Sequence, residues 1–120
     1  MKNLELNQNL SQFHGTEHYH AYYNLYLTDG IKYLAEQAQC YWLIDVIWSH
    51  TLCKKWLGTE DFITCTLTAT NSKGRVIFDD GNDNILAKQE IPYTDFPLDK
   101  IKIFIVSNGD KFVVMLPSEY

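Results

Sequence analysis

Arginine is almost absent from this sequence. Arg75 is the only one among ten basic residues, which stand against fifteen Asp and Glu for a formal charge of −5. Proteins that bind nucleic acids normally present a basic face whose arginines grip phosphates, so the composition argues against DNA or RNA as a partner. An acidic mimic of DNA would need a denser negative charge than −5 spread over 120 residues. We therefore expect no role that involves nucleic acid.

Long hydrophobic runs and paired cysteines are lacking as well. No stretch of about 20 apolar residues occurs, and residues 1–15 do not contain the apolar core of a secretory signal, so we expect neither a membrane span nor secretion. The cysteines, Cys40, Cys53 and Cys65, are odd in number, widely spaced and form no Cys-x-x-Cys motif. Reduced thiols in a cytoplasmic protein are the expectation.

The familiar catalytic and cofactor motifs are also missing. No serine lies in a Gly-x-Ser-x-Gly motif, and no glycine-rich phosphate loop is present. Residues 79–84 superficially resemble a calcium loop, but Gly81 comes too early for that spacing, and the segment is better interpreted as a hairpin turn. We expect no cofactor. Enzymatic activity stays open, and a non-catalytic role is favoured.

What the chain does have is a dense apolar block at residues 40–48, in which Asp45 is the only polar residue. We predict a helix over residues 41–56, preceded by an amphipathic helix over residues 28–39; a single kinked helix is the alternative. Because the block is apolar nearly all round, the second helix should be covered on most sides. Asp45 then needs a hydrogen-bonded partner or a place at the edge of the apolar face.

From residue 62 onward, apolar and polar residues alternate with the period of a strand. The pattern predicts a five-stranded antiparallel meander over residues 62–70, 75–79, 84–91, 100–107 and 111–116. Read as a type I′ turn, Asn108-Gly109 sets Ile105 opposite Phe112. One face then carries Ile101, Ile103, Ile105, Phe112, Val114 and Leu116, and this face should pack on the helix over residues 41–56.

Helices followed by strands indicate an α+β fold. We assign residues 13–120 to a single domain, preceded by an arm or short helix over residues 1–12. Within the core, the prediction is that Trp42, Leu43, Val46 and Ile47 pack on the second hairpin.

Three of the four histidines, His14, His18 and His20, lie close together in the sequence. If the segment were helical, His14 and His18 would share a face, as zinc ligands do. A zinc site needs three or four ligands, and nothing else in the sequence completes this one, so we predict no metal.

Tyrosine is abundant, with eight residues in a small domain, and Tyr and Trp are favoured at interfaces. The tyrosines near residue 22 could line a groove or a dimer contact, or simply cover the open face of the sheet. The candidate pocket or interface residues are Glu17, Tyr19, Tyr22, Tyr23, Tyr26 and Asp45. Two hypotheses follow: a module that binds a protein partner or itself, and a ligand-binding protein or enzyme with a pocket between the helix over residues 41–56 and the sheet.

Several segments resemble a family of short, uncharacterised bacterial proteins that is found on plasmids and in phages. They include Gly15-Thr16-Glu17, Thr28-Asp29-Gly30, Tyr33-Leu34-Ala35-Glu36, Tyr41-Trp42-Leu43-Ile44-Asp45, Asp79-Asp80-Gly81-Asn82, the segment Ile91-Pro92-Tyr93-Thr94-Asp95-Phe96-Pro97-Leu98, and Leu116-Pro117-Ser118-Glu119-Tyr120. The resemblance covers nearly all of the chain after Phe13. It implies a bacterial or mobile-element setting but no established activity, substrate or catalytic residue.

Overall fold

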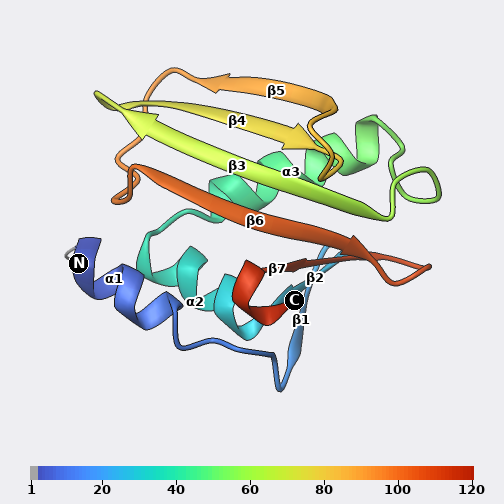
Figure 1. Cartoon of the computed structure of the whole chain (residues 1–120), viewed down its shortest axis with the longest axis horizontal. Helices are drawn as coiled ribbons and strands as arrows, with labels where there is room; N and C mark the ends of the chain where they lie inside the picture. Colours follow the sequence, from blue (N-terminus) through green and yellow to red (C-terminus); the bar gives the residue numbers. More distant parts are fainter. Residues whose placement is uncertain (1–2) are drawn as a thin grey trace.

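The structure is a computed structural model that describes residues 3–120, so the first two residues of the predicted N-terminal arm lie outside it. The α+β class predicted from the sequence is confirmed (Figure 1). The elements, in chain order, are α1 (Asn3–Leu10), β1 (Tyr19–Tyr22), β2 (Leu25–Thr28), α2 (Asp29–Gln37), α3 (Tyr41–Cys53), β3 (Phe62–Thr70), β4 (Lys73–Asp79), β5 (Ile85–Ile91), β6 (Lys100–Ser107), β7 (Phe112–Met115) and a short 3-10 helix, η1 (Pro117–Glu119).

The sheet differs from the predicted five-stranded antiparallel meander. Its seven strands in the described part of the chain lie in the order β1-β2-β7-β6-β3-β4-β5. Strand β6 pairs with β3 and not with β5, because the connection over residues 92–99 carries the chain back past both β4 and β3. Strand β3 is therefore an interior strand, paired with β4 on one side and β6 on the other, and β6 is the middle strand of the sheet.

The two strands that the prediction missed form the hairpin β1–β2. Each strand has only four residues, and their turn, Tyr23-Asn24, lacks the glycine that marks a hairpin in a sequence. Strand β2 pairs in parallel with β7, so the N-terminal hairpin extends the sheet at the end opposite to β5. A parallel contact between strands so distant in sequence leaves no local pattern to read.

The second hairpin has the predicted face but a different register. Ile105 lies opposite Val114, and Ser107 lies opposite Phe112. The loop is longer than the predicted two-residue turn, since the Asn108 side-chain oxygen accepts hydrogen bonds from the backbone N–H groups of Asp110 (3.0 Å) and Lys111 (2.8 Å). The register differs by two residues, which is one full period of a strand, so the same side chains still face the core.

The helices begin and break close to where the sequence places them. The Thr28 hydroxyl accepts a hydrogen bond from the backbone N–H of Ile31 and caps α2. Two separate helices follow, because Gln39 adopts a left-handed conformation (φ 51°) between them. Helix α3 ends at Cys53 and not near Trp56, although the Trp56 side chain is still buried.

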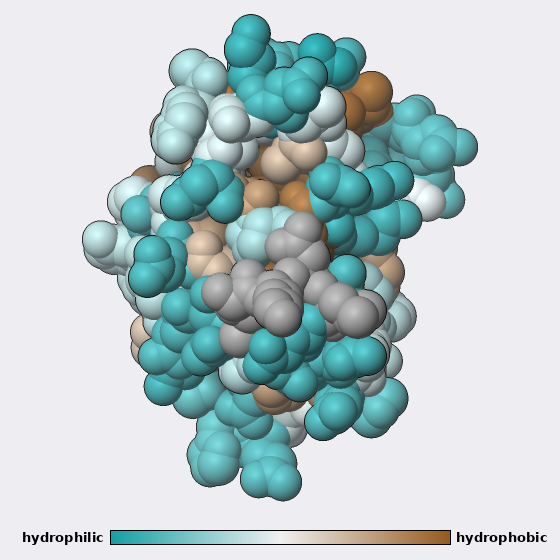
Figure 2. All heavy atoms as spheres, turned by 90° about the vertical axis from the view of Figure 1, so that its left-hand side faces the viewer, coloured by the Kyte–Doolittle hydropathy of each residue, from teal (hydrophilic) through white to brown (hydrophobic). Residues whose placement is uncertain are grey.

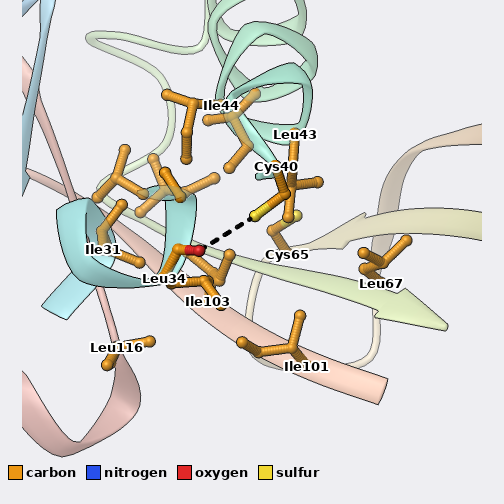
Figure 3. Close-up of a cluster of buried hydrophobic side chains, with 14 of the residues drawn as sticks. Ile31, Leu34, Cys40, Leu43, Ile44, Cys65, Leu67, Ile101, Ile103 and Leu116 are labelled. Atoms are coloured by element: carbon orange, nitrogen blue, oxygen red, sulfur yellow. Dashed lines mark hydrogen bonds between the residues drawn. The ribbon is translucent and has the colours of Figure 1, made fainter. Parts of the chain in front are cut away.

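The core lies between α2 and α3 on one side and one face of the sheet on the other (Figure 3). Leu43, Ile44 and Ile47 of α3 are fully buried, whereas Trp42 and Val46 are only partly buried. The stripe that packs on the sheet is therefore rotated from the predicted one. The expectation that α3 is covered on most sides is also wrong, because Tyr41, Asp45 and Leu52 are exposed on its outer side.

Two of the cysteines are part of this core. The Cys40 thiol donates a weak hydrogen bond to the carbonyl oxygen of Leu34 (3.7 Å; Figure 3), and burial raises the pKa of this thiol to about 12. Burial also raises the pKa of the Cys65 thiol. A thiol kept protonated in this way is a poor nucleophile, so both residues serve in packing.

Helix α1 closes the lower side of the core through Leu6 and Leu10, and the Asn9 side-chain N–H donates a hydrogen bond to the Tyr33 hydroxyl (2.8 Å). Figure 2 shows the left-hand end of Figure 1, where hydrophilic atoms predominate and apolar atoms emerge only in small areas between them. Among the described helices, none combines the length and apolar character that crossing a membrane requires.

Candidate functional site

Segments far apart in the sequence meet at the start of α2. The Glu119 carboxylate accepts hydrogen bonds from the Thr28 hydroxyl (2.7 Å) and from the backbone N–H groups of Gly30 (3.0 Å) and Leu116 (3.0 Å). A carboxylate at a helix N-terminus satisfies unpaired N–H groups and is favoured by the helix dipole. Since these bonds join the C-terminal segment to α2, their role is structural.

Asp29, the next residue along, ties down the segment before β1. Its carboxylate accepts a hydrogen bond from the backbone N–H of Glu17 (3.0 Å) and lies 2.8 Å from His20 Nε2, while its own backbone N–H donates to the Thr16 hydroxyl (2.8 Å). The bond with His20, followed by that from Glu17, lowers the pKa of Asp29 to about 2.

This network predicts a pH dependence of stability. The pKa of Asp29 is lower in the folded chain than its ordinary value near 3.8, so the carboxylate stabilises the fold above that value, and the stabilisation is lost as the pH falls toward 2. The melting temperature of the wild type should therefore fall more steeply between about pH 4 and about pH 2 than that of Asp29→Asn, as followed by circular dichroism. Equal slopes would rule out this contribution.

The three histidines weighed as metal ligands, His14, His18 and His20, lie in two different settings. His14 and His18 are exposed in an irregular segment with no helix, and His20 lies on β1, bonded to Asp29. Over residues 3–120, no three His, Cys, Asp or Glu side chains are grouped so that they could hold a metal ion.

The predicted pocket or interface residues lie in three different places. The Glu17 side chain is exposed, and its backbone anchors Asp29. Tyr19 packs edge-on against Tyr26, with Lys111 Nζ 5.0 Å from the Tyr26 ring centroid. Tyr22, Tyr23 and Asp45 come together beside α3.

For Asp45 the sequence predicted either a hydrogen-bonded partner or a place at the edge of the apolar face, and the structure shows a partner as well as exposure to solvent. The Tyr22 hydroxyl donates to Asp45 Oδ1 at 2.6 Å, which links the β1–β2 hairpin to α3. Asp45 is exposed, so this is not a buried ion in the core. Desolvation, followed by the bond to Asp45, raises the pKa of Tyr22 to about 12, so the phenol remains a donor at neutral pH.

Around this bond lies a group of aromatic side chains that we call the α3 aromatic surface. The Tyr22 ring stacks on Tyr41 (centroids 5.8 Å apart), and the Tyr23 ring stacks on Trp48 (4.6 Å). On α3, Tyr41, Asp45, Trp48 and Leu52 follow one another at the spacing of a single helical stripe. The surface comprises Tyr22, Tyr23, Tyr41, Asp45, Trp48 and Leu52.

Tyr23 has the most unusual conformation in this group. It adopts φ 53° in the turn between β1 and β2, a left-handed conformation that is uncommon for a bulky side chain and costs of order 1 kcal/mol or more. Its ring is nevertheless 68% exposed. The turn thus holds an aromatic ring against Trp48 and toward solvent, where a glycine or asparagine would be less strained.

An apolar hollow of about 230 Å³ continues the surface beyond Leu52. It is lined by Asn24, Thr51, Leu52, Lys55, Leu57 and Phe112. Leu52 and Leu57 are 50% and 39% exposed. The hollow has the size and lining to accept a single apolar side chain from a partner.

The space between α3 and the sheet, where the sequence suggested a pocket, is filled by side chains. Leu43, Ile44 and Ile47 from the helix meet Ile63, Cys65, Phe78 and Ile103 from the sheet, all of them fully buried. Every buried polar side-chain atom of the described residues has a hydrogen-bond partner. No group in this interface is therefore left to orient a ligand.

Sequence reasoning missed Tyr41, Trp48 and Leu52 as surface residues. Asp45 was the available signal, because a carboxylate inside an apolar helix marks the side that faces water. Residues at i−4, i+3 and i+7 from Asp45 lie on that same side, and these are Tyr41, Trp48 and Leu52.

The geometry defines an α+β domain with a mixed seven-stranded sheet and a partly exposed aromatic helix. Residues 4–120 match a family of unknown function, DUF6876, and the chain belongs to that family. No curated protein and no solved structure matches the chain.

Proposed function

We propose that this protein is a small, non-catalytic interaction module that binds another protein through the α3 aromatic surface. The observation that carries the proposal is the exposure of this apolar surface on the helix that forms the centre of the core. On α3, Leu52 and Tyr41 are 50% and 36% exposed, and Tyr23 of the adjacent β1–β2 turn is 68% exposed. By contrast, Leu43, Ile44 and Ile47 of α3 are fully buried.

The chemistry of the surface resembles that of known interface centres. Binding energy concentrates in Tyr and Trp side chains that lie beside a pocket and become desolvated on binding. Here three tyrosine rings and one tryptophan are already held in place by stacking, so little rotamer entropy remains to be lost on binding. The Tyr22–Asp45 hydrogen bond supplies a polar group at the edge of the surface.

The setting that we propose is the cytoplasm of a bacterium or of a bacterial host of mobile elements. Two considerations support this setting. The sequence resembles short bacterial proteins found on plasmids and in phages, and its three cysteines are free thiols, two of them buried in the core.

We expect Tyr23→Ser combined with Leu52→Ser to weaken partner binding at least tenfold, because each substitution removes an exposed apolar side chain from the surface. The matched control is Tyr93→Ser combined with Ile85→Ser, which removes side chains that are 72% and 54% exposed elsewhere on the molecule. The measurement is quantitative affinity capture from lysate of the host, together with light scattering to detect self-association. The proposal fails if the wild type is a strict monomer that captures nothing, or if both pairs behave alike.

A further inference from the structure

The face of the sheet that points away from α3 carries half of the Lys and Arg side chains of the chain. It is the face turned toward the viewer in Figure 1, where α3 lies behind the strands. The chain has ten Lys and Arg, and five of them lie on the part of this face formed by β3, β4, β5 and β6: Lys73, Arg75, Lys88, Lys100 and Lys102. All five are exposed.

Strand pairing places these cations around a centre made of two threonines and one isoleucine. In one row Lys88 pairs with Ile77, Ile77 with Thr66, and Thr66 with Lys102. In the next row, Glu90 pairs with Arg75, Arg75 with Thr68, and Thr68 with Lys100. Directly paired residues project from the same face, and neighbouring strands lie about 4.8 Å apart, so each row spans roughly 14 Å.

The charge of this area is opposite to that of the rest of the molecule. Two carboxylates lie in the same area. Glu90 accepts a hydrogen bond from Arg75 Nε (2.7 Å), and Asp79 lies on β4 opposite Thr64, one row further along the sheet than Thr66. Five cations and two carboxylates give the area a formal charge of +3. Because the whole chain has a formal charge of −5, the rest of the chain has a formal charge of −8. A partner attracted to this area must be negative.

A shallow hollow provides a place for an anionic group. It has a volume of about 260 Å³ and is lined by Thr68, Thr70, Lys73, Gly74, Arg75 and Glu90. Hydroxyl groups and two cations line it, and a guanidinium has five N–H donors, of which the bond to Glu90 uses the one on Nε. A carboxylate would find both charge and hydrogen-bond donors there.

We propose that this basic sheet face binds an acidic segment of a partner protein, which lies in extended form across β5, β4, β3 and β6. Single-stranded nucleic acid is the other polyanion of suitable shape, but its binding platforms offer aromatic rings on which bases stack. Between these cations lie Thr66, Thr68 and Ile77. The aromatic rings on this side of the sheet, Phe62, Phe104 and Tyr120, pack edge-to-face on one another. A long nucleic acid would also extend over the acidic remainder of the surface.

The experiment uses the full chain and a fluorescein-labelled peptide of about eight residues that alternates glutamate with threonine, so that its carboxylates project from one side of a strand. Fluorescence anisotropy at low ionic strength should show binding that weakens as salt is added, because exposed charges are screened. Lys88→Gln combined with Lys102→Gln should weaken binding roughly three- to tenfold. The matched control, Lys32→Gln combined with Lys54→Gln, removes one cation on α2 and one just after α3, neither of them on this face, and should leave binding within about twofold.

Three results of the peptide experiment would overturn the proposal: no binding at low salt, an equal loss of affinity in the two lysine pairs, or tighter binding of a thymidine oligonucleotide of matched charge.

Self-association would overturn it as well. If the wild type formed a salt-sensitive oligomer and Lys88→Gln combined with Lys102→Gln made it monomeric, the acidic partner would be a second copy of the chain. Tyr23→Ser should bind the peptide as the wild type does, so failure here is distinguishable from failure of the α3 aromatic surface.

Discussion

Gly30→Ala should lower the free energy of unfolding by about 2–4 kcal/mol, although alanine is normally the better helix residue by about 1 kcal/mol. A Cβ at Gly30 would lie 2.5 Å from Glu119 Oε1 and 2.6 Å from Leu116 Cδ1. Neither atom can move cheaply, because the carboxylate holds three hydrogen bonds and Leu116 is buried. The cost of displacing them exceeds the gain in helix propensity.

The measurement is urea unfolding monitored by tryptophan fluorescence. Gly15→Ala is the control, because nothing lies within 4 Å of the added methyl group, and its effect should stay within about 0.5 kcal/mol. If Gly30→Ala were as stable as the wild type, the contact between η1 and the start of α2 would not exist as described.

Ile47→Ala should cost about 2–5 kcal/mol, a large part of the roughly 5–15 kcal/mol that stabilises a domain. Ile47 is fully buried among the side chains that fill the space between α3 and the sheet, so truncation removes apolar burial and leaves a cavity. Unfolding in denaturant with unchanged slope would measure the loss.

Leu52→Ala is the matched control on the same helix. Its side chain is 50% exposed, so the loss of stability should stay below about 1 kcal/mol. The pair therefore separates the packing side of α3 from the side that we assign to binding. Similar costs for both substitutions would mean that the outer side of α3 is buried too.

Periodicity in the sequence identified much of the fold, since a core face repeats whatever the register. Ile101, Ile103 and Ile105 were assigned to the correct face even though the hairpin register is shifted by two residues. The break between α2 and α3 was also found, because the apolar pattern widens there. Register and strand order depend on loop geometry and on distant pairing, and the meander was wrong for that reason.

The candidate site was less accessible from the sequence. Asp45 was correctly expected to have a partner, but Tyr22 could not be named as that partner, because the β1–β2 hairpin has no glycine turn to reveal it. The expectation that a helix apolar nearly all round is covered on most sides hid Tyr41 and Trp48. In this chain α3 has more apolar residues than the core contains, and the additional ones lie at the surface. These exposed apolar side chains are what suggests an interaction.

The most direct test of the α3 aromatic surface is site-specific crosslinking in the host cell. A photo-reactive phenylalanine derivative at Tyr23 preserves an aromatic ring in the turn, and the same residue at Tyr93 provides an equally exposed control (68% and 72%). We expect position 23 to yield one discrete crosslinked protein, identifiable by mass spectrometry, and position 93 to yield none. No adduct at position 23, or the same adducts at both positions, would contradict the assignment of this surface.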